Sequence, residues 1–318
     1  MQYIVLDMEW NQAWPGSYAA KRVPEKFRGE IIQIGAVRVT DRQIVGDEFQ
    51  VLIKPKVFRK LNKRVSQLTG IKDAQLAEFG IPFPEAMEQF RDWCGDDCVF
   101  LTWGFDDIGI LKENMALHGL DDTWVDRWYN AQMMFNAQTD GATAQKALKT
   151  AMQMAGVEAS RPAHDALGDA YHTAILCTRL DLPRGMQEYD QAMKKHEDGF
   201  HGAEIPGCVA RKVFHGYTSK DAAMDALSGP ENLCPKCETP MTHSKWVSQQ
   251  GKRYMTMSCC PEHGTFLIRV RFAPDEDGTI KASRLIYESN SEAAKAYETV
   301  KPKVRKRRSR KTVSPKQT

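Results

Sequence analysis

Short apolar runs separated by polar turns organise the first part of the chain. Brief runs rich in β-branched and aromatic residues are typical of buried strands. The predicted strands cover residues 3–6, 31–39, 49–53 and 99–102. Residues 41–43 suit a hairpin-like turn between the second and third runs, so we expect a meander of strands before the first helices.

Helical periodicity follows the strand meander. Ala86, Phe90 and Trp93 fall at i, i+4 and i+7, on one face of a helix that begins near Pro84. Strands that then alternate with helices predict an α/β fold over residues 1–182, a mixed sheet flanked by helices. The further predicted elements are helices at 108–117, 142–155 and 166–180 and a strand end at Trp124-Val125.

The pattern changes after Pro183. Residues 183–230 are predicted to be a helical and polar connector that forms no core of its own. Residues 231–290 are predicted to be a small β-rich domain, and residues 291–318 a basic, disordered tail. The strands expected in the small domain cover residues 245–247, 254–257, 264–272 and 279–287.

Composition narrows the class of protein. Of the 318 residues 42% are hydrophobic, and no apolar run approaches the roughly 18 residues of a membrane span. The N-terminus has no basic segment ahead of its apolar run, which argues against a secretory signal. We therefore expect a cytoplasmic protein with no membrane partner.

The net charge of +3 hides an uneven distribution. Residues 301–318 contain nine Lys or Arg and no acid, so the first 300 residues carry −6. A basic run of this kind attracts phosphates without reading sequence, and in a eukaryote it can also act as a nuclear-localisation signal. A purely solubilising tail is the alternative.

Two acids at the end of the first strand are candidate metal ligands. Asp7 and Glu9 stand at i and i+2, so strand alternation places both carboxylates on one face. Buried carboxylates repel each other and lose hydration, and a divalent cation compensates both costs. The alternative is that Glu9 already lies past the strand, in solvent.

Further acids and a histidine follow at strand-to-helix junctions, where ligands gather in such sheets. Asp106 follows a short strand. Asp165 is a candidate N-cap, Asp169 falls one turn inside the next helix, and His164 precedes the cap. Four carboxylates suit two Mg²⁺ or Mn²⁺ ions that hydrolyse a phosphodiester, with His164 as the base for the attacking water.

These motifs resemble those of the DEDDh 3′–5′ exonuclease family, in the order Asp7-Met8-Glu9, Asp106 and His164-x4-Asp169. Residues 30–36 and 65–71 also resemble family segments, so the likeness covers about residues 1–180. The resemblance implies an RNase H-like fold, two bound Mg²⁺ or Mn²⁺ ions and release of nucleoside 5′-monophosphates from RNA or another single strand. RNA is favoured over DNA, and a catalytically idle binding module is the other alternative.

The resemblance also assigns roles to single residues. It implies that Asp7, Glu9, Asp106 and Asp169 bind the metals, that His164 is the base, and that Met8 and Trp10 contact the terminal nucleotide. For Trp10, a packed core aromatic is an equally good interpretation. An aromatic residue before the motif Asp and a Leu about five positions after it favour Asp106, with Asp107 as a solvated neighbour. His172 is interpreted as structural.

The second half carries a separate candidate metal site. Cys234-Pro-Lys-Cys237 and Cys260-Pro-Glu-His263 are two knuckles of equal spacing, separated by 22 residues. Four such ligands suit a tetrahedral structural Zn²⁺ in a zinc ribbon, whereas a redox CxxC would give no reason for the second knuckle. Cys259 and His243 are alternative ligands. Basic residues around Trp246 and Tyr254 either bind single strands or are simply solvated, and protein partners are unknown.

Overall fold

A computed structural model describes residues 2–14, 16–18, 20–24, 27–40, 42–202, 205 and 207–300 of the chain. The chain divides into two compact units, Met1–Glu197 and Asp198–Thr318. Among the described residues, no helix has the length and apolar character needed to cross a bilayer.

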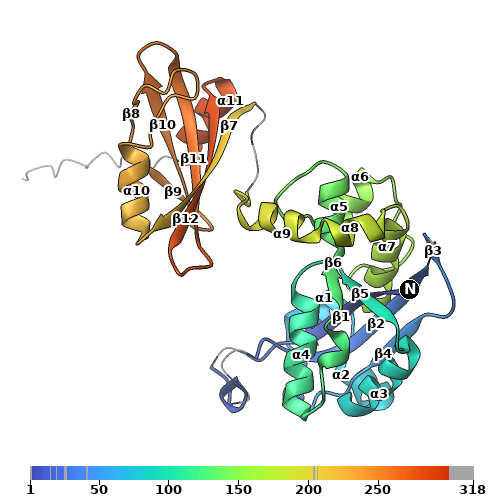
Figure 1. The fold of residues 1–318 in the computed structure, drawn as a ribbon. Helices are drawn as coiled ribbons and strands as arrows, with labels where there is room; N and C mark the ends of the chain where they lie inside the picture. The colour runs from blue at the N-terminus through green and yellow to red at the C-terminus, as the bar shows by residue number, and fades with distance from the viewer. Residues whose placement is uncertain are drawn as a thin grey trace, which may run out of the picture. The chain divides into compact units, whose positions relative to one another are not determined.

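A six-stranded mixed sheet forms the centre of the first unit (Figure 1). Its order is β3-β2-β1-β5-β6, with β4 pairing to β2. β1 is antiparallel to β2 and parallel to β5, and β6 is parallel to β5. The strands are β1 Gln2–Asn11, β2 Glu30–Thr40, β3 Gln43–Ile44, β4 Phe49–Leu52, β5 Cys98–Thr102 and β6 Trp128–Asn130.

Helices cover both faces of this sheet. As a result, β1 and β5 have buried side chains on both sides. Residues of α3 and α4 pack on one face, and residues of α5, α6, α7 and α8 pack on the other. The helices are α1 Lys63–Thr69, α2 Asp73–Phe79, α3 Phe83–Cys94, α4 Asp106–His118, α5 Ala131–Gln138, α6 Leu148–Met154, α7 Ala166–Thr178, α8 Leu182–Gln187 and α9 Tyr189–Glu197, with 3₁₀ turns η1 Ala20–Arg22 and η2 Thr123–Val125.

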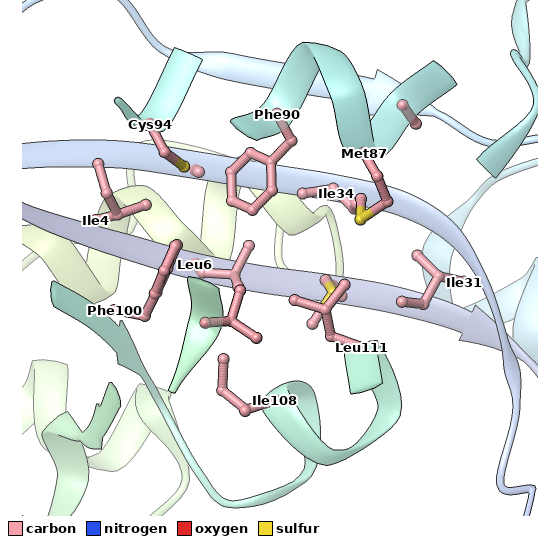
Figure 2. Packing of buried hydrophobic residues seen from close by; sticks show 14 of the residues in the cluster. Ile4, Leu6, Ile31, Ile34, Met87, Phe90, Cys94, Phe100, Ile108 and Leu111 are labelled. Carbon is pink, nitrogen blue, oxygen red and sulfur yellow. The ribbon is translucent and has the colours of Figure 1, made fainter. Parts of the chain in front are cut away.

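Strand alternation divides the side chains of β1 between the two cores. Ile4 and Leu6 point into the core beneath α3 and α4, where Figure 2 shows them beside Phe90 and Phe100. Val5 points into the opposite core, beneath α5 to α7. The predicted mixed sheet flanked by helices is confirmed.

Several predicted boundaries in the first unit are wrong. β1 runs to Asn11 rather than ending at residue 6, so Glu9 lies inside the strand with Asp7 as expected, and the alternative that it lies past the strand is wrong. Trp124 and Val125 belong to the 3₁₀ turn η2, and the strand that follows begins at Trp128. The helix expected at 142–155 covers only 148–154, and α5 was not predicted at all.

The second unit is a six-stranded antiparallel sheet of order β7-β12-β11-β10-β8, with β9 pairing to β10. One core includes residues of α10 and the cysteine knuckles, and another includes residues of α11. The elements are β7 Cys208–Tyr217, α10 Lys220–Ser228, β8 Thr242–His243, β9 Val247–Gln249, β10 Arg253–Cys260, β11 Gly264–Pro274, β12 Ile280–Glu288 and α11 Ser291–Val300.

This unit corrects two expectations. Residues 208–228 are not a connector, because β7 pairs with β12 and α10 contributes Ala223 and Leu227 to the core. The tail predicted to begin at 291 instead starts with α11, which buries Tyr297. Its basic part, residues 301–318, lies outside the described residues.

Candidate active site and cysteine cluster

A glycine on β2, Gly35, lets α7 approach the acidic end of β1. Asp7 pairs in register with Gly35, and a Cβ on Gly35 would lie 2.1 Å from the backbone nitrogen of Leu167. Only a glycine therefore allows the first turn of α7 to lie directly on the sheet at this point. This contact brings the start of α7 to the face from which Asp7 and Glu9 project.

Polar contacts fix the start of α7 in this position. Asp165 caps the helix by accepting the Gly168 N–H at 3.0 Å. Gln33, which pairs with Glu9 across the two strands, donates its side-chain amide to Asp165 at 2.7 Å and accepts the Ala166 N–H at 3.1 Å. The cap and the acidic strand are thus tied together through one side chain.

His164 and Asp169 meet just beyond this cap. Oδ2 of Asp169 accepts the backbone N–H of His164 at 2.9 Å, while His164 adopts a left-handed backbone with φ of 59°. Ligand atoms of Glu9, His164 and Asp169 lie within 4.8 Å of one another. The structure therefore brings Glu9 of β1 together with His164 and Asp169.

Asp106 and Asp107 are arranged differently from the expectation. The Asp106 side chain is 70% exposed, and its Oδ1 forms an ion pair with Nη1 of Arg28 at 2.8 Å. Asp107 is 6% exposed, and its Oδ1 accepts the Met8 N–H at 3.1 Å. β5 pairs with β1 only as far as Leu6, so the Met8 N–H on that side takes a carboxylate instead of a strand. The expectation that Asp107 is a solvated neighbour is wrong.

Burial and mutual repulsion raise the pKa values of the clustered carboxylates. The pKa of Asp7 lies well above its usual value because of burial, then Asp107, Asp169 and Glu9. Burial, followed by the charges of Asp169 and Asp107, raises the pKa of Glu9 to about 8. Burial also raises the pKa of Asp107 to about 7 and raises the pKa of Asp169. This donor set fits hard divalent cations, which prefer carboxylate oxygens.

These residues surround a cavity of about 370 Å³. Part of its wall comes from α1 through Arg64, Val65 and Leu68, and Leu68 is 53% exposed. Trp103, whose indole N–H donates to the Lys146 carbonyl at 3.0 Å, forms another part. None of these residues was predicted as a site residue, although residues 65–71 carried a family-like segment that could have indicated the α1 wall.

The two predicted nucleotide contacts occupy different environments. Met8 is 2% exposed and packs in the core, which leaves its side chain little surface for a nucleotide. Trp10 is half-buried, packs against the same core and lines the cavity. His172 is buried and accepts the Ser160 N–H at 3.1 Å, which gives its ring a structural partner.

The four knuckle residues of the second unit also converge. The Sγ atoms of Cys237 and Cys260 are 3.7 Å apart, and Nδ1 of His263 lies 3.7 Å from Sγ of Cys234 and 3.8 Å from Sγ of Cys260. Zinc–sulfur bonds of about 2.3 Å in a tetrahedron separate two sulfurs by about 3.8 Å, so the spacing fits Zn²⁺.

The alternative ligands lie outside this cluster. Cys259 is exposed and its neighbour Cys260 is buried, because adjacent residues on β10 face opposite sides of the sheet. His243 is exposed and its Nδ1 lies 2.7 Å from the Ser244 carbonyl oxygen. The cluster is therefore made of Cys234, Cys237, Cys260 and His263.

A sequence profile of the RNase T exonuclease family matches residues 4–177, more than half of the chain. The chain belongs to this exonuclease family. Its acidic cavity thus lies in a DEDDh-type 3′–5′ exonuclease domain, and membership implies the use of divalent metal ions. The cysteine cluster lies beyond the matched residues.

Curated relatives match part of this chain. ERI1 exoribonuclease 2 of Homo sapiens is 26% identical over 180 residues, which is 48% of this chain and 25% of that protein. The probable 3′–5′ exonuclease KapD of Bacillus subtilis is 30% identical over 112 residues, which is 35% of this chain and 51% of that protein. The matches thus span from a quarter to about half of the relatives' own length.

Solved exonuclease structures resemble the chain at lower identity. The nuclease domain of 3′hExo, a DEDDh family member bound to rAMP, is 21% identical with a TM-score of 0.49, covering 56% of this chain and 90% of that one. Exonuclease I of E. coli in complex with a dA16 oligonucleotide is 16% identical with a TM-score of 0.45, covering 87% of this chain and 56% of that one.

Proposed function

We propose that this protein is a two-metal-ion 3′–5′ exonuclease that releases nucleoside 5′-monophosphates from the 3′ end of a single strand. The observation that carries the proposal is the group of one buried and three half-buried carboxylates with raised pKa values, which shares one cavity with His164. Such a group is costly for a folded protein unless cations compensate it.

We assign the metal-binding role to Asp7, Glu9, Asp107 and Asp169. Asp107 replaces the expected Asp106 because burial and the contact with β1 place it among the other three carboxylates, whereas Asp106 pairs with Arg28 at the rim. Two divalent ions, when bound, stabilise the attacking and leaving oxygens of a phosphodiester. Mg²⁺ and Mn²⁺ are the ions that such an all-oxygen set favours.

His164 is proposed to accept the proton of the attacking water. Its exposed ring stands at the cavity wall, and the Asp169 carboxylate holds its backbone N–H at 2.9 Å. An imidazole nitrogen can accept a proton from water at neutral pH, which suits this task. Asp169 would therefore position the base as well as bind metal.

RNA is the substrate that we favour. The support is the name of the human relative, an exoribonuclease. A DNA-directed exonuclease is the alternative within the same chemistry. For the second unit we propose a structural Zn²⁺ held by Cys234, Cys237, Cys260 and His263.

The proposal is tested with matched 3′-labelled RNA and DNA oligonucleotides, each with and without Mn²⁺. We expect Mn²⁺-dependent release of labelled nucleoside 5′-monophosphate, faster from RNA, and loss of that release in Asp7→Asn. Faster release from DNA would overturn only the substrate assignment. Tight binding of both strands without release by the native chain would instead identify an idle binding module.

A further inference from the structure

A basic segment joins the last strand of the meander to the wall of the acidic cavity. Residues 54–64 contain six Lys or Arg and no acid. All six side chains are exposed, and none forms an ion pair with another residue that the structure describes. The cations are Lys54, Lys56, Arg59, Lys60, Lys63 and Arg64. Six unpaired cations on eleven residues are a concentrated positive field beside a site that we assign to a polyanion.

The backbone of this segment is held rigidly in place. The buried carboxylate of Glu30 accepts the N–H groups of Lys56, Val57 and Phe58 at 2.5–3.0 Å. Asn11, buried at the end of β1, donates to the Phe58 and Lys60 carbonyls and accepts the Asn62 N–H at 2.9 Å. An ordered backbone lowers the entropy that the segment loses when it binds a ligand.

The segment also connects two hollows of the first unit. Lys54, Lys56 and Arg59 line a cavity of about 660 Å³, whose wall also includes Phe83 and the stacked ring of His118. At its other end, Arg64 lines the acidic cavity. One acid, Asp73, borders the larger hollow, and its carboxylate accepts the Leu61 N–H at 2.9 Å.

We propose that this basic segment binds the backbone phosphates of the single strand on the 5′ side of the nucleotide being removed. The strand would leave the acidic cavity past Arg64 and continue to the larger hollow, where Lys56 and Arg59 bind its phosphates. The inference rests on the proposed exonuclease function. It adds a phosphate-binding track that makes the enzyme prefer long strands to dinucleotides.

The test compares Lys56→Gln/Arg59→Gln with a matched charge-removal variant, Arg91→Gln/Arg127→Gln. Arg91 lies in the last turn of α3, and Arg127 pairs with Asp97. The control therefore removes two exposed cations near the amino ends of β5 and β6, away from the carboxyl ends of the parallel strands where the acidic cavity lies. KM and kcat are measured on a 12-nucleotide single strand and on the dinucleotide UpU at 50 and 200 mM salt. Binding of the labelled 12-mer is measured in an Asp7→Asn background.

Each phosphate contact to a single strand contributes about 0.7 to the salt slope, so losing two contacts lowers the slope by about 1.4. Between 50 and 200 mM salt, we therefore expect the KM of the native enzyme for the 12-mer to rise about sevenfold more than that of Lys56→Gln/Arg59→Gln. Cleavage of UpU should be unchanged, and the control variant should behave as the native enzyme.

Equal salt slopes in all three proteins, with UpU cleaved normally, would refute phosphate binding by the basic segment and leave the exonuclease function intact. If the native protein cleaves no substrate, the proposed exonuclease function is refuted. The binding measurement still tests whether the basic segment binds phosphates. A lower salt slope of 12-mer binding in Lys56→Gln/Arg59→Gln alone would support it. An unchanged slope would refute it.

Discussion

Asp106 and Asp107 are adjacent in the sequence, yet the first turn of α4 gives their side chains opposite environments. Asp107 turns inward to the Met8 N–H and Asp106 turns outward to Arg28. Local sequence could not decide between them, because the choice depends on where β5 ends relative to β1. Asp7, Glu9, His164 and Asp169 were easier to predict, since strand alternation and helix capping act over a few residues.

The first residue-scale prediction separates the two acids. Asp107→Asn should lower exonuclease activity by more than about 100-fold, exceeding the 10–100-fold cost typical of residues that only support metal ligands. Asp106→Asn, the matched control, should retain most of the activity. The measurement is Mn²⁺-dependent nucleotide release by each purified variant. The reverse ranking would restore Asp106 as the ligand.

The second residue-scale prediction concerns the protons that the carboxylates release when metal binds. Because burial raises the pKa of Glu9 from 4.5 to about 8, its stabilising contribution is full below 4.5 and is lost as pH rises through 8. The metal-free protein should therefore become less stable across that window, while Mn²⁺ binds more tightly and releases protons. Calorimetric titrations with MnCl₂ in two buffers of different ionisation enthalpy measure that release, and Glu9→Gln should release fewer. Identical heats in both buffers would contradict the raised pKa.

At the scale of elements, apolar runs predicted the central strands β1, β2 and β5 but not β7. Most β7 side chains are at least partly exposed and Phe214 is buried, so β7 has no continuous apolar run. It lies at the edge of its sheet, and only its pairing with β12 identifies it as a strand. The knuckles were recognisable because four ligands at fixed spacing are a local signal.

The element-scale prediction uses two nearby cysteines of the knuckle region. Cys234→Ser should lose stoichiometric zinc and destabilise the second unit, because metal binding contributes folding free energy to a small unit. Cys259→Ser should keep both the zinc and the stability, since Cys259 is exposed outside the cluster. Elemental analysis and thermal unfolding of the two variants provide the measurement. A folded native protein without zinc would refute the site.

On the scale of the whole molecule, the charge distribution is more informative than the net charge. The chain totals +3, yet its first 300 residues carry −6 and residues 301–318 carry nine positive charges. The acidic cavity accounts for part of the negative charge, and it requires cations before a phosphate can approach. The basic segment at 54–64 and the terminal tail are the regions that we expect to attract the substrate.

Deleting residues 301–318 tests this division. We expect weaker binding of long single strands and a shallower dependence of binding on salt, because phosphate contacts are lost. Cleavage of UpU should hardly change, since a dinucleotide does not reach beyond the cavity. Fluorescence anisotropy at several salt concentrations measures the binding. An unchanged salt slope would show that the tail takes no part.

The most direct test of the central claim follows the released product. A 3′-labelled RNA is incubated with the native protein, Asp7→Asn and His164→Ala, with Mn²⁺ or with a chelator, and the products are separated by chromatography. The account predicts labelled nucleoside 5′-monophosphate from the native protein with Mn²⁺ alone, and little or none from either variant. Equal release by the native protein and both variants, or release that persists with the chelator, would contradict it.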